Sequence, residues 1–161
     1  MPIRLGTALA GGGAVVALGV AGLSTAIGVR AAGVSAAGAV AENKENFKNG
    51  LVLQSLPQTQ TIYAFITALF IIMGTGLLAG GGRELTIYEG AVMFCAALVV
   101  AITSISAVFQ GSIAAAGIAS SAKNSDAFVP SIVFAGQAET PAIFGFISAL
   151  IVLVVGMGVL G

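Results

Sequence analysis

The chain is 161 residues long, 58% hydrophobic and only 7% charged, and its formal net charge is zero. This composition excludes a disordered chain and argues against an ordinary water-soluble domain. The few basic residues argue against a nucleic-acid surface, and the absence of histidine removes imidazole catalysis and most zinc sites. The single Cys95 cannot form an internal disulfide, and we expect it to pack as a small hydrophobic residue.

Four apolar segments follow one another along the chain, at about 5–41, 51–79, 88–121 and 129–160. Each is longer than the ~20 residues that cross a bilayer as a helix, and helices satisfy backbone hydrogen bonds within lipid. The sequence therefore predicts an all-α membrane protein with four transmembrane helices. The short polar connections make successive helices antiparallel neighbours. These connections are predicted at Glu42–Gly50, Gly80–Ile87 and Ala122–Phe128.

The N-terminal segment has a competing interpretation as a signal peptide over residues 1–30, with Arg4 in its basic region. The apolar run continues to about Ala41, beyond a typical signal peptide, which favours a retained first helix. The positive-inside rule places the first and third connections in the cytoplasm, because more basic residues fall on their side of the membrane. Those residues are Arg30, Lys44, Lys48 and Lys123, against Arg4 and Arg83 on the other side.

The chain repeats internally. Residues 63–69 match residues 144–150, which lie 81 positions later, and residues 35–38 match residues 114–117, which lie 79 positions later. A duplication of one helical hairpin explains both matches. It divides the chain into a first hairpin over 1–82 and a second over 83–161. In the 81-residue register Gln58 is the counterpart of Glu139, so the first hairpin has no matching acid.

Glu139 is the acidic residue that lies inside an apolar segment rather than between or at the edge of two segments. A charged side chain at the centre of a membrane costs at least ~2.5–3.5 kcal/mol on insertion scales. A satisfied polar contact between helices is the alternative. The cost favours a functional role for Glu139.

Several polar residues of other segments lie at a similar depth. Pro57 interrupts the hydrogen-bond ladder of the second segment and frees backbone oxygen. Gln110 lies in the third segment, and at ~1.5 Å per residue these groups are some 15–18 Å from their polar connections. One helical face of the second segment adds a main-chain oxygen and three polar side chains. Its residues are Leu56, Thr59, Gln60 and Tyr63.

Carboxylate, amide, hydroxyl and carbonyl oxygens are hard donors that suit a hard cation, and one carboxylate favours Na⁺ over Ca²⁺. Na⁺ bound to a single carboxylate is neutral, as a site passing through lipid requires. A protonated carboxyl is neutral as well, so H⁺ is the alternative ion. Ordinary hydrogen bonding between helices, at ~0.6 kcal/mol each, is the alternative for the glutamines and threonine.

The chain resembles the duplicated proteolipid, also called the c-ring or K subunit, of V-type and archaeal A-type rotary ATPases. Three motifs carry the resemblance: Leu56-Pro57-Gln58-Thr59-Gln60, Gln110-Gly111 before Ala114-Ala115-Ala116-Gly117, and Ala138-Glu139-Thr140. They are similar to those of the sodium-binding bacterial and archaeal members. Gln58 departs from the glycine of a familiar sodium-binding member, which puts helix contacts near the site in doubt.

The resemblance implies both a site and a mechanism. Identical subunits form a rotor ring with their first and third helices inside, in the bacterial or archaeal plasma membrane. The ring turns against a static membrane subunit with an essential arginine, and its cytoplasmic loops touch the central stalk. The chain itself has no catalytic site and no bound cofactor beyond the transported ion. The implied Na⁺ ligands are Leu56 (main-chain oxygen), Thr59, Gln60, Gln110 and Glu139, with Tyr63 holding the carboxylate.

A small independent antiporter for cations or drugs is the rival class. Four-helix exporters of that kind carry their carboxylate in the first helix beside Trp and Tyr residues. This chain carries Glu139 in the fourth segment and has no Trp. A purely structural membrane bundle is a third possibility, and it leaves Glu139 without a role.

Overall fold

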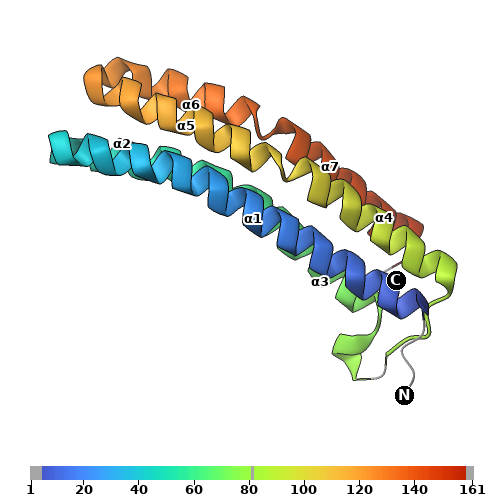
Figure 1. The fold of residues 1–161 in the computed structure, drawn as a ribbon. Coiled ribbons are helices and arrows are strands. Elements are labelled where there is room, and N and C mark those ends of the chain that lie inside the picture. Colours follow the sequence, from blue (N-terminus) through green and yellow to red (C-terminus); the bar gives the residue numbers. More distant parts are fainter. Residues whose placement is uncertain (1–4, 81, 159–161) are drawn as a thin grey trace. The chain divides into compact units, whose positions relative to one another are not determined.

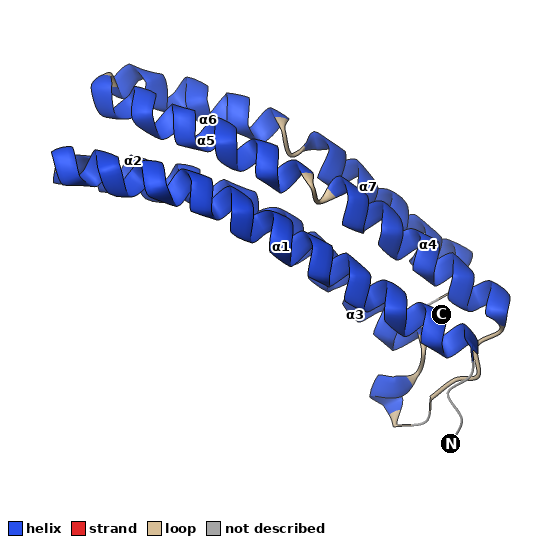
Figure 2. Ribbon diagram, viewed as in Figure 1, coloured by secondary structure: helices blue, strands red, loops and turns tan. Residues whose placement is uncertain are grey.

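A computed structural model describes residues 5–80 and 82–158. Within these ranges the chain is helical, with no strand (Figure 2). Figure 1 follows the helices along the chain from blue to red. The first half contains α1 (Leu5–Glu42), η1 (Lys44–Asn46), α2 (Phe47–Ser55), η2 (Leu56–Gln58), α3 (Thr59–Gly74) and η3 (Leu77–Ala79). The second half contains α4 (Ile87–Thr103), α5 (Ser106–Lys123), η4 (Ser125–Ala127), α6 (Phe128–Gln137), α7 (Thr140–Ile151) and the π-helical η5 (Val152–Gly156).

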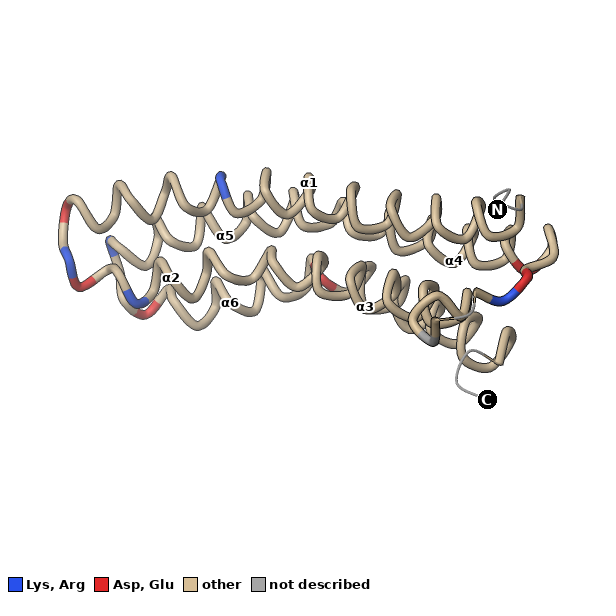
Figure 3. The backbone as a smooth tube through the Cα atoms, turned by 90° about the horizontal axis from the view of Figure 1, so that it is seen from below, with Lys and Arg blue, Asp and Glu red and all other residues tan. Residues whose placement is uncertain are grey.

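The structure confirms the all-α membrane class. In the described part of the chain, three helical stretches are long and apolar enough to cross a membrane: Leu5–Glu42, Lys44–Gly74 and Ile87–Lys123. A fourth span results when the helices on either side of Ala138 and Glu139 are counted together as one broken helix. Figure 3 shows the charged positions, most of which fall at helix ends and in connections. Among the described charged residues, Arg30 lies within a helix, and Glu139 lies at the break inside the fourth span.

Two of the predicted polar connections are wrong in length. The first shrinks from Glu42–Gly50 to the single residue Asn43, and the third shrinks from Ala122–Phe128 to Asn124. The reason is side-chain capping: Asn43 Oδ1 accepts from the Glu45 N–H at 3.0 Å, and Asn124 Oδ1 accepts from the Asp126 N–H at 3.1 Å. A capped chain re-enters a helix at once despite its polar composition.

The other predicted boundaries shift by a few residues. The second helix ends at Gly74 rather than near 79, because Gly76 takes a positive φ of 70° and a short 3-10 turn follows it. The predicted end of the fourth segment near 160 lies outside the described residues, as does Arg4. Arg83, in the connection before α4, forms an ion pair with Glu89 in the first turn of that helix at 3.1 Å. There Thr86 and Glu89 form a capping box that starts the helix.

The chain forms two compact units, each of which combines parts of both predicted hairpins. The first unit contains the described residues of 1–21, 61–104 and 142–161, and its core is built on small residues such as Ala10, Ala17 and Ala97, with Ile71 and Met93. The second contains residues 22–60 and 105–141. Its core consists of Ala32, Ala36, Ala39, Leu53, Ala114, Ile118 and Ala135.

The duplication is visible in the second unit. Its two capped turns begin at Asn43 and Asn124, 81 positions apart, and α2 and α6 begin 81 positions apart at Phe47 and Phe128. The close contacts repeat in the same register. A side chain on Gly50 would press on Ala36, and one on Gly117 would collide with Ser131. The 81-residue register therefore extends through α1 and α5, and the match of residues 35–38 with 114–117 is two residues out of that register.

Candidate ion-binding site

The second unit contains η2, where Pro57 stands in the first turn of a 3-10 helix. Proline has no N–H to donate, so the α-helical ladder is interrupted and the turn tightens. The Leu56 carbonyl accepts the Thr59 N–H of this turn, and the Pro57 carbonyl accepts the Thr25 hydroxyl at 3.0 Å. The predicted loosening of the α-helical hydrogen-bond ladder thus takes the form of a 3-10 turn. The carbonyls of Leu56 and Pro57 in this turn each accept a hydrogen bond from the protein.

The Thr59 hydroxyl lies between two oxygens of its own segment. It is 3.1 Å from the Leu56 carbonyl oxygen and 3.2 Å from Gln60 Oε1. A hydroxyl has one proton, so it donates to one of these oxygens at a time. Leu56, Thr59 and Gln60 therefore place three oxygen atoms next to one another at the junction of η2 and α3.

Gln60 and Gln110 form the buried centre of the cluster. Both side chains are 0% exposed, and Gln60 Nε2 donates to Gln110 Oε1 at 2.8 Å. Gln60 Nε2 also lies 3.4 Å from the Ser106 hydroxyl. Each amide oxygen has two lone pairs, so each retains acceptor capacity beyond these bonds. A paired amide group avoids the desolvation penalty that an isolated buried one incurs.

Glu139 completes the network. Gln110 Nε2 donates a long hydrogen bond of 3.5 Å to Glu139 Oε2. Glu139 follows the end of α6 and immediately precedes α7, whose second residue is Pro141. The Glu139 N–H bonds to the Gly136 carbonyl at 3.1 Å, so the backbone turns tightly there. The partial positive charge of a helix N-terminus next to this position favours a carboxylate.

Five of the six predicted site residues thus lie together in the second unit. They are Leu56, Thr59, Gln60, Gln110 and Glu139. Tyr63 belongs to the first unit, where its ring stacks on Phe146 with the centroids 5.0 Å apart. Its predicted hydrogen bond to the carboxylate stays a prediction. Among the described residues no three His, Cys, Asp or Glu side chains cluster.

Sequence reasoning missed Ser106 and Thr25. Ser106 stands one helical turn before Gln110 in α5, so the i, i+4 spacing indicated that both share a face. Thr25 lies in α1, where no other residue of the cluster marks it out. Its role becomes visible only through the bond to Pro57.

The polar cluster and the repeated helices define a class: a membrane protein of two helical hairpins related by duplication, with a single carboxylate in its polar cluster. A sequence profile for the C subunit of ATP synthase matches residues 12–71 and again residues 94–152. The chain therefore belongs to the family of ATP synthase C subunits. This confirms the predicted resemblance and the predicted class, a component of the membrane ring of a rotary ATPase and not its catalytic part.

Two relatives support this membership. The chain is 36% identical to the A-type ATP synthase subunit K of Methanocaldococcus jannaschii, over 88% of its own length and 60% of the relative's. It is 37% identical to the V-type sodium ATPase subunit K of Enterococcus hirae, over 82% of each chain. The chain thus spans less than two thirds of the length of the archaeal relative.

Proposed function

We propose that the chain is a rotor-ring subunit that carries Na⁺ across the membrane on Glu139. The observation that supports this most strongly is the buried Gln60–Gln110 pair leading to a half-buried carboxylate. A charged group is expensive in lipid, and so are buried amides without partners. A set of oxygen donors that share one carboxylate gives a monovalent cation a neutral binding site. The name of the bacterial relative, a sodium ATPase subunit, agrees with this ion.

In this proposal the cation takes oxygen ligands from three helical segments. The Leu56 carbonyl, the Thr59 hydroxyl and the Gln60 amide oxygen come from η2 and the start of α3, Gln110 comes from α5, and Glu139 from the junction of α6 and α7. Rigid helices hold these groups, and the Gln60–Gln110 bond orients both amides. Na⁺ neutralises Glu139, and Tyr63 supports the carboxylate by a hydrogen bond.

Coupling follows from desolvation. A site with bound Na⁺ has no net charge and passes through lipid, whereas an empty Glu139 carboxylate does not. In our proposal a static membrane subunit supplies an arginine that accompanies the empty carboxylate and displaces the ion. Rotation and ion movement then require each other. The turns at Asn43 and Asn124, next to Lys44, Lys48 and Lys123, face the cytoplasm and the central stalk of a plasma-membrane enzyme.

Carbodiimide labelling tests the ion. A carbodiimide modifies a protonated carboxyl, so we expect labelling of Glu139 that slows as Na⁺ is raised at fixed pH. Intact-mass analysis counts the adducts, with one expected per chain, and peptide mass mapping identifies the labelled residue. Choline chloride at equal ionic strength is the control. Labelling that is independent of Na⁺ would reject sodium and leave H⁺ as the carried ion. Labelling at a residue other than Glu139 would reject the site.

A further inference from the structure

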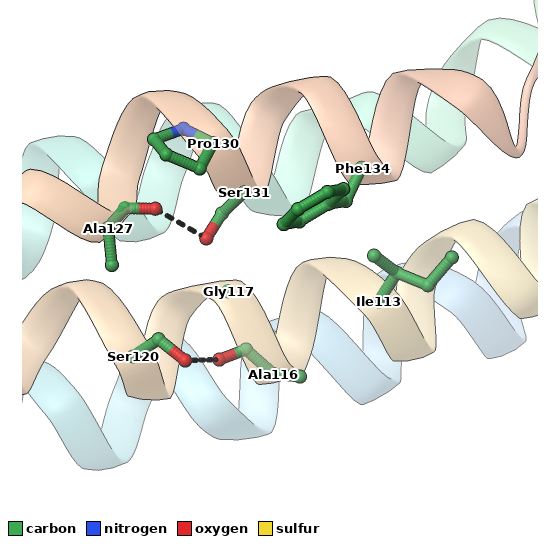
Figure 4. Close-up of a pocket in the computed structure, with 8 residues that line it drawn as sticks. All are labelled: Ile113, Ala116, Gly117, Ser120, Ala127, Pro130, Ser131 and Phe134. Atoms are coloured by element: carbon green, nitrogen blue, oxygen red, sulfur yellow. Dashed lines mark hydrogen bonds between the residues drawn. The ribbon is translucent and has the colours of Figure 1, made fainter.

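A groove runs along the second unit between α5 and α6 (Figure 4). The hydroxyls within it are bonded to their own helices: Ser120 donates to the Ala116 carbonyl at 2.9 Å, and Ser131 to the Ala127 carbonyl at 2.6 Å. The groove is therefore apolar toward an occupant. Phe134 stands at its edge, and 60% of the Phe134 side chain is exposed.

The duplicated counterpart of this groove is already filled. In the 81-residue register Ile113, Gly117, Ser120 and Phe134 correspond to Ala32, Ala36, Ala39 and Leu53. These four are at most 8% exposed, and they share a core with Ala114 and Ile118 of α5. Ser35 of the same face donates to the Ala115 carbonyl at 2.8 Å. Inside the chain, α5 thus occupies the groove between α1 and α2.

The counterpart of α5 is α1, where the counterpart of Ala114 is Gly33, which lies against Gln54, while two neighbouring positions of the same face are exposed. Ala115 and Ile118 correspond to Val34 and Ala37. Val34 is 67% exposed and Ala37 is exposed as well. We propose that α1 of a second copy of this chain occupies the groove between α5 and α6, with Val34 and Ala37 inserted beside Phe134. The inference rests on the proposed ring, and it names the faces through which neighbouring copies meet.

A second pair of positions fits the same contact. Inside the chain Gly28 of α1 lies against Ala107 and Gly111 of α5, with no room for a side chain on either glycine. The counterparts are Phe109, which is 63% exposed, and Ala26 and Arg30, which are exposed as well. Arg30 has no ion pair in the described part of the chain.

The proposed contact therefore places Arg30 of one copy over the ring of Phe109 of the next. A guanidinium on an aromatic face is a favourable cation–π contact, and it is stronger away from water. These bulky residues replace glycines, so the helices are farther apart between copies than within one chain. The two faces differ, which makes the contact head-to-tail and repeatable, as a closed ring requires.

Cysteine cross-linking tests the interface. Ala116 and Val34 are the counterparts of Ser35 and Ala115, which touch inside the chain. In a Cys95→Ser background, co-expressed chains with Val34→Cys alone and Ala116→Cys alone should form a mixed cross-linked dimer on oxidation. A chain with both cysteines should form a ladder of dimers, trimers and higher species. Neither single variant should cross-link when expressed by itself.

The matched control replaces Ala116→Cys by Val133→Cys. Val133 is 53% exposed on α6, and its counterpart Val52 is 42% exposed inside the chain, so this position is outside the duplicated contact. Equal cross-linking by the control pair would overturn the proposal. The mass of the detergent-extracted assembly tests the ring separately from the interface. A large homo-oligomer without the Val34–Ala116 cross-link rejects the interface alone, and a monomer rejects the ring as well.

The Arg30–Phe109 contact has its own test in the thermal dissociation of the purified ring. Arg30→Ala and Phe109→Ala should each lower the dissociation temperature, and the double variant should lower it by less than the sum. Phe144→Ala, at another exposed phenylalanine, should combine additively with Arg30→Ala. Additive effects of Arg30→Ala and Phe109→Ala would reject the contact.

Discussion

The two hairpins interrupt their apolar helices at corresponding positions, but with different chemistry. The first has Leu56-Pro57-Gln58 in a 3-10 turn, and the second has Gln137-Ala138-Glu139 at the break between α6 and α7. The first turn is followed by Thr59 and Gln60, which supply neutral oxygens. The second supplies the carboxylate. At these two interruptions one hairpin therefore carries the charge and the other carries neutral oxygens, so in our proposal one chain forms one site rather than two.

The same difference appears in the packing. The groove between α1 and α2 is lined by alanines and closed by Leu53, which is 0% exposed. The groove between α5 and α6 is edged by Phe134, which is 60% exposed. Equivalent surfaces are thus internal in the first hairpin and open in the second. Changes at paired positions should therefore affect folding in one hairpin and assembly in the other.

The largest effect is expected for Glu139→Gln. The amide has nearly the same shape but no charge, so the chain should fold and assemble while ATP-driven Na⁺ uptake into vesicles falls to background. Glu45→Gln, in the exposed turn η1, is the matched control and should leave uptake unchanged. Uptake that survives Glu139→Gln would remove this carboxylate from ion transport.

Gln110→Ala should have the next largest effect. It removes the 2.8 Å bond to Gln60 and the 3.5 Å bond to Glu139, and leaves Gln60 with Ser106 as a distant partner. An unpaired buried amide costs about 1–3 kcal/mol. We expect the Na⁺ concentration that protects Glu139 from carbodiimide to rise roughly tenfold or more, since ~1.4 kcal/mol is a factor of ten. An unchanged protection curve, matching that of a Gln54→Ala control in α2, would exclude Gln110 as a ligand.

Leu53→Ala and Phe134→Ala compare the closed groove with the open one. Leu53 is fully buried, so its truncation should lower the free energy of unfolding by about 2–5 kcal/mol. Phe134→Ala should change the unfolding of the isolated chain much less and instead lower the dissociation temperature of the ring. Thermal unfolding of detergent-extracted monomer and of ring measures both. Equal effects of the two variants on the monomer would contradict the comparison.

Gln58→Glu should have the smallest effect on the existing site. It restores an acid at the counterpart of Glu139, but the counterparts of Gln60 and Gln110 are Pro141 and Val29, which have no side-chain oxygen. We expect a second carboxyl that reacts with carbodiimide at a rate independent of Na⁺, while Na⁺ still protects Glu139. Peptide mass mapping distinguishes the two positions. Protection of both carboxyls by Na⁺ would show that the first hairpin retains a binding site.

The sequence by itself determined the class of this protein. Four apolar segments, an isolated carboxylate and an internal repeat predict a duplicated helical membrane protein, because lipid restricts the backbone to helices and penalises charge. It also marked the polar residues of the cluster other than Ser106 and Thr25, since helical periodicity and depth are local properties. The lengths of the connections were mispredicted at Asn43 and Asn124, where a side-chain cap outweighs polar composition.

Only the tertiary structure decided which of these residues meet. The Gln60–Gln110 bond joins positions in different hairpins, and Thr25 bonds to Pro57 from a helix without other members of the cluster. Hydrogen-bond geometry depends on how the helices are rotated and shifted against one another, which the packing of small residues sets. The register of the duplication through α1 and α5 emerged in the same way, from Gly50 against Ala36 and Gly117 against Ser131. In a chain rich in Ala and Gly, sequence matches alone leave that register ambiguous, whereas close contacts admit few alternatives.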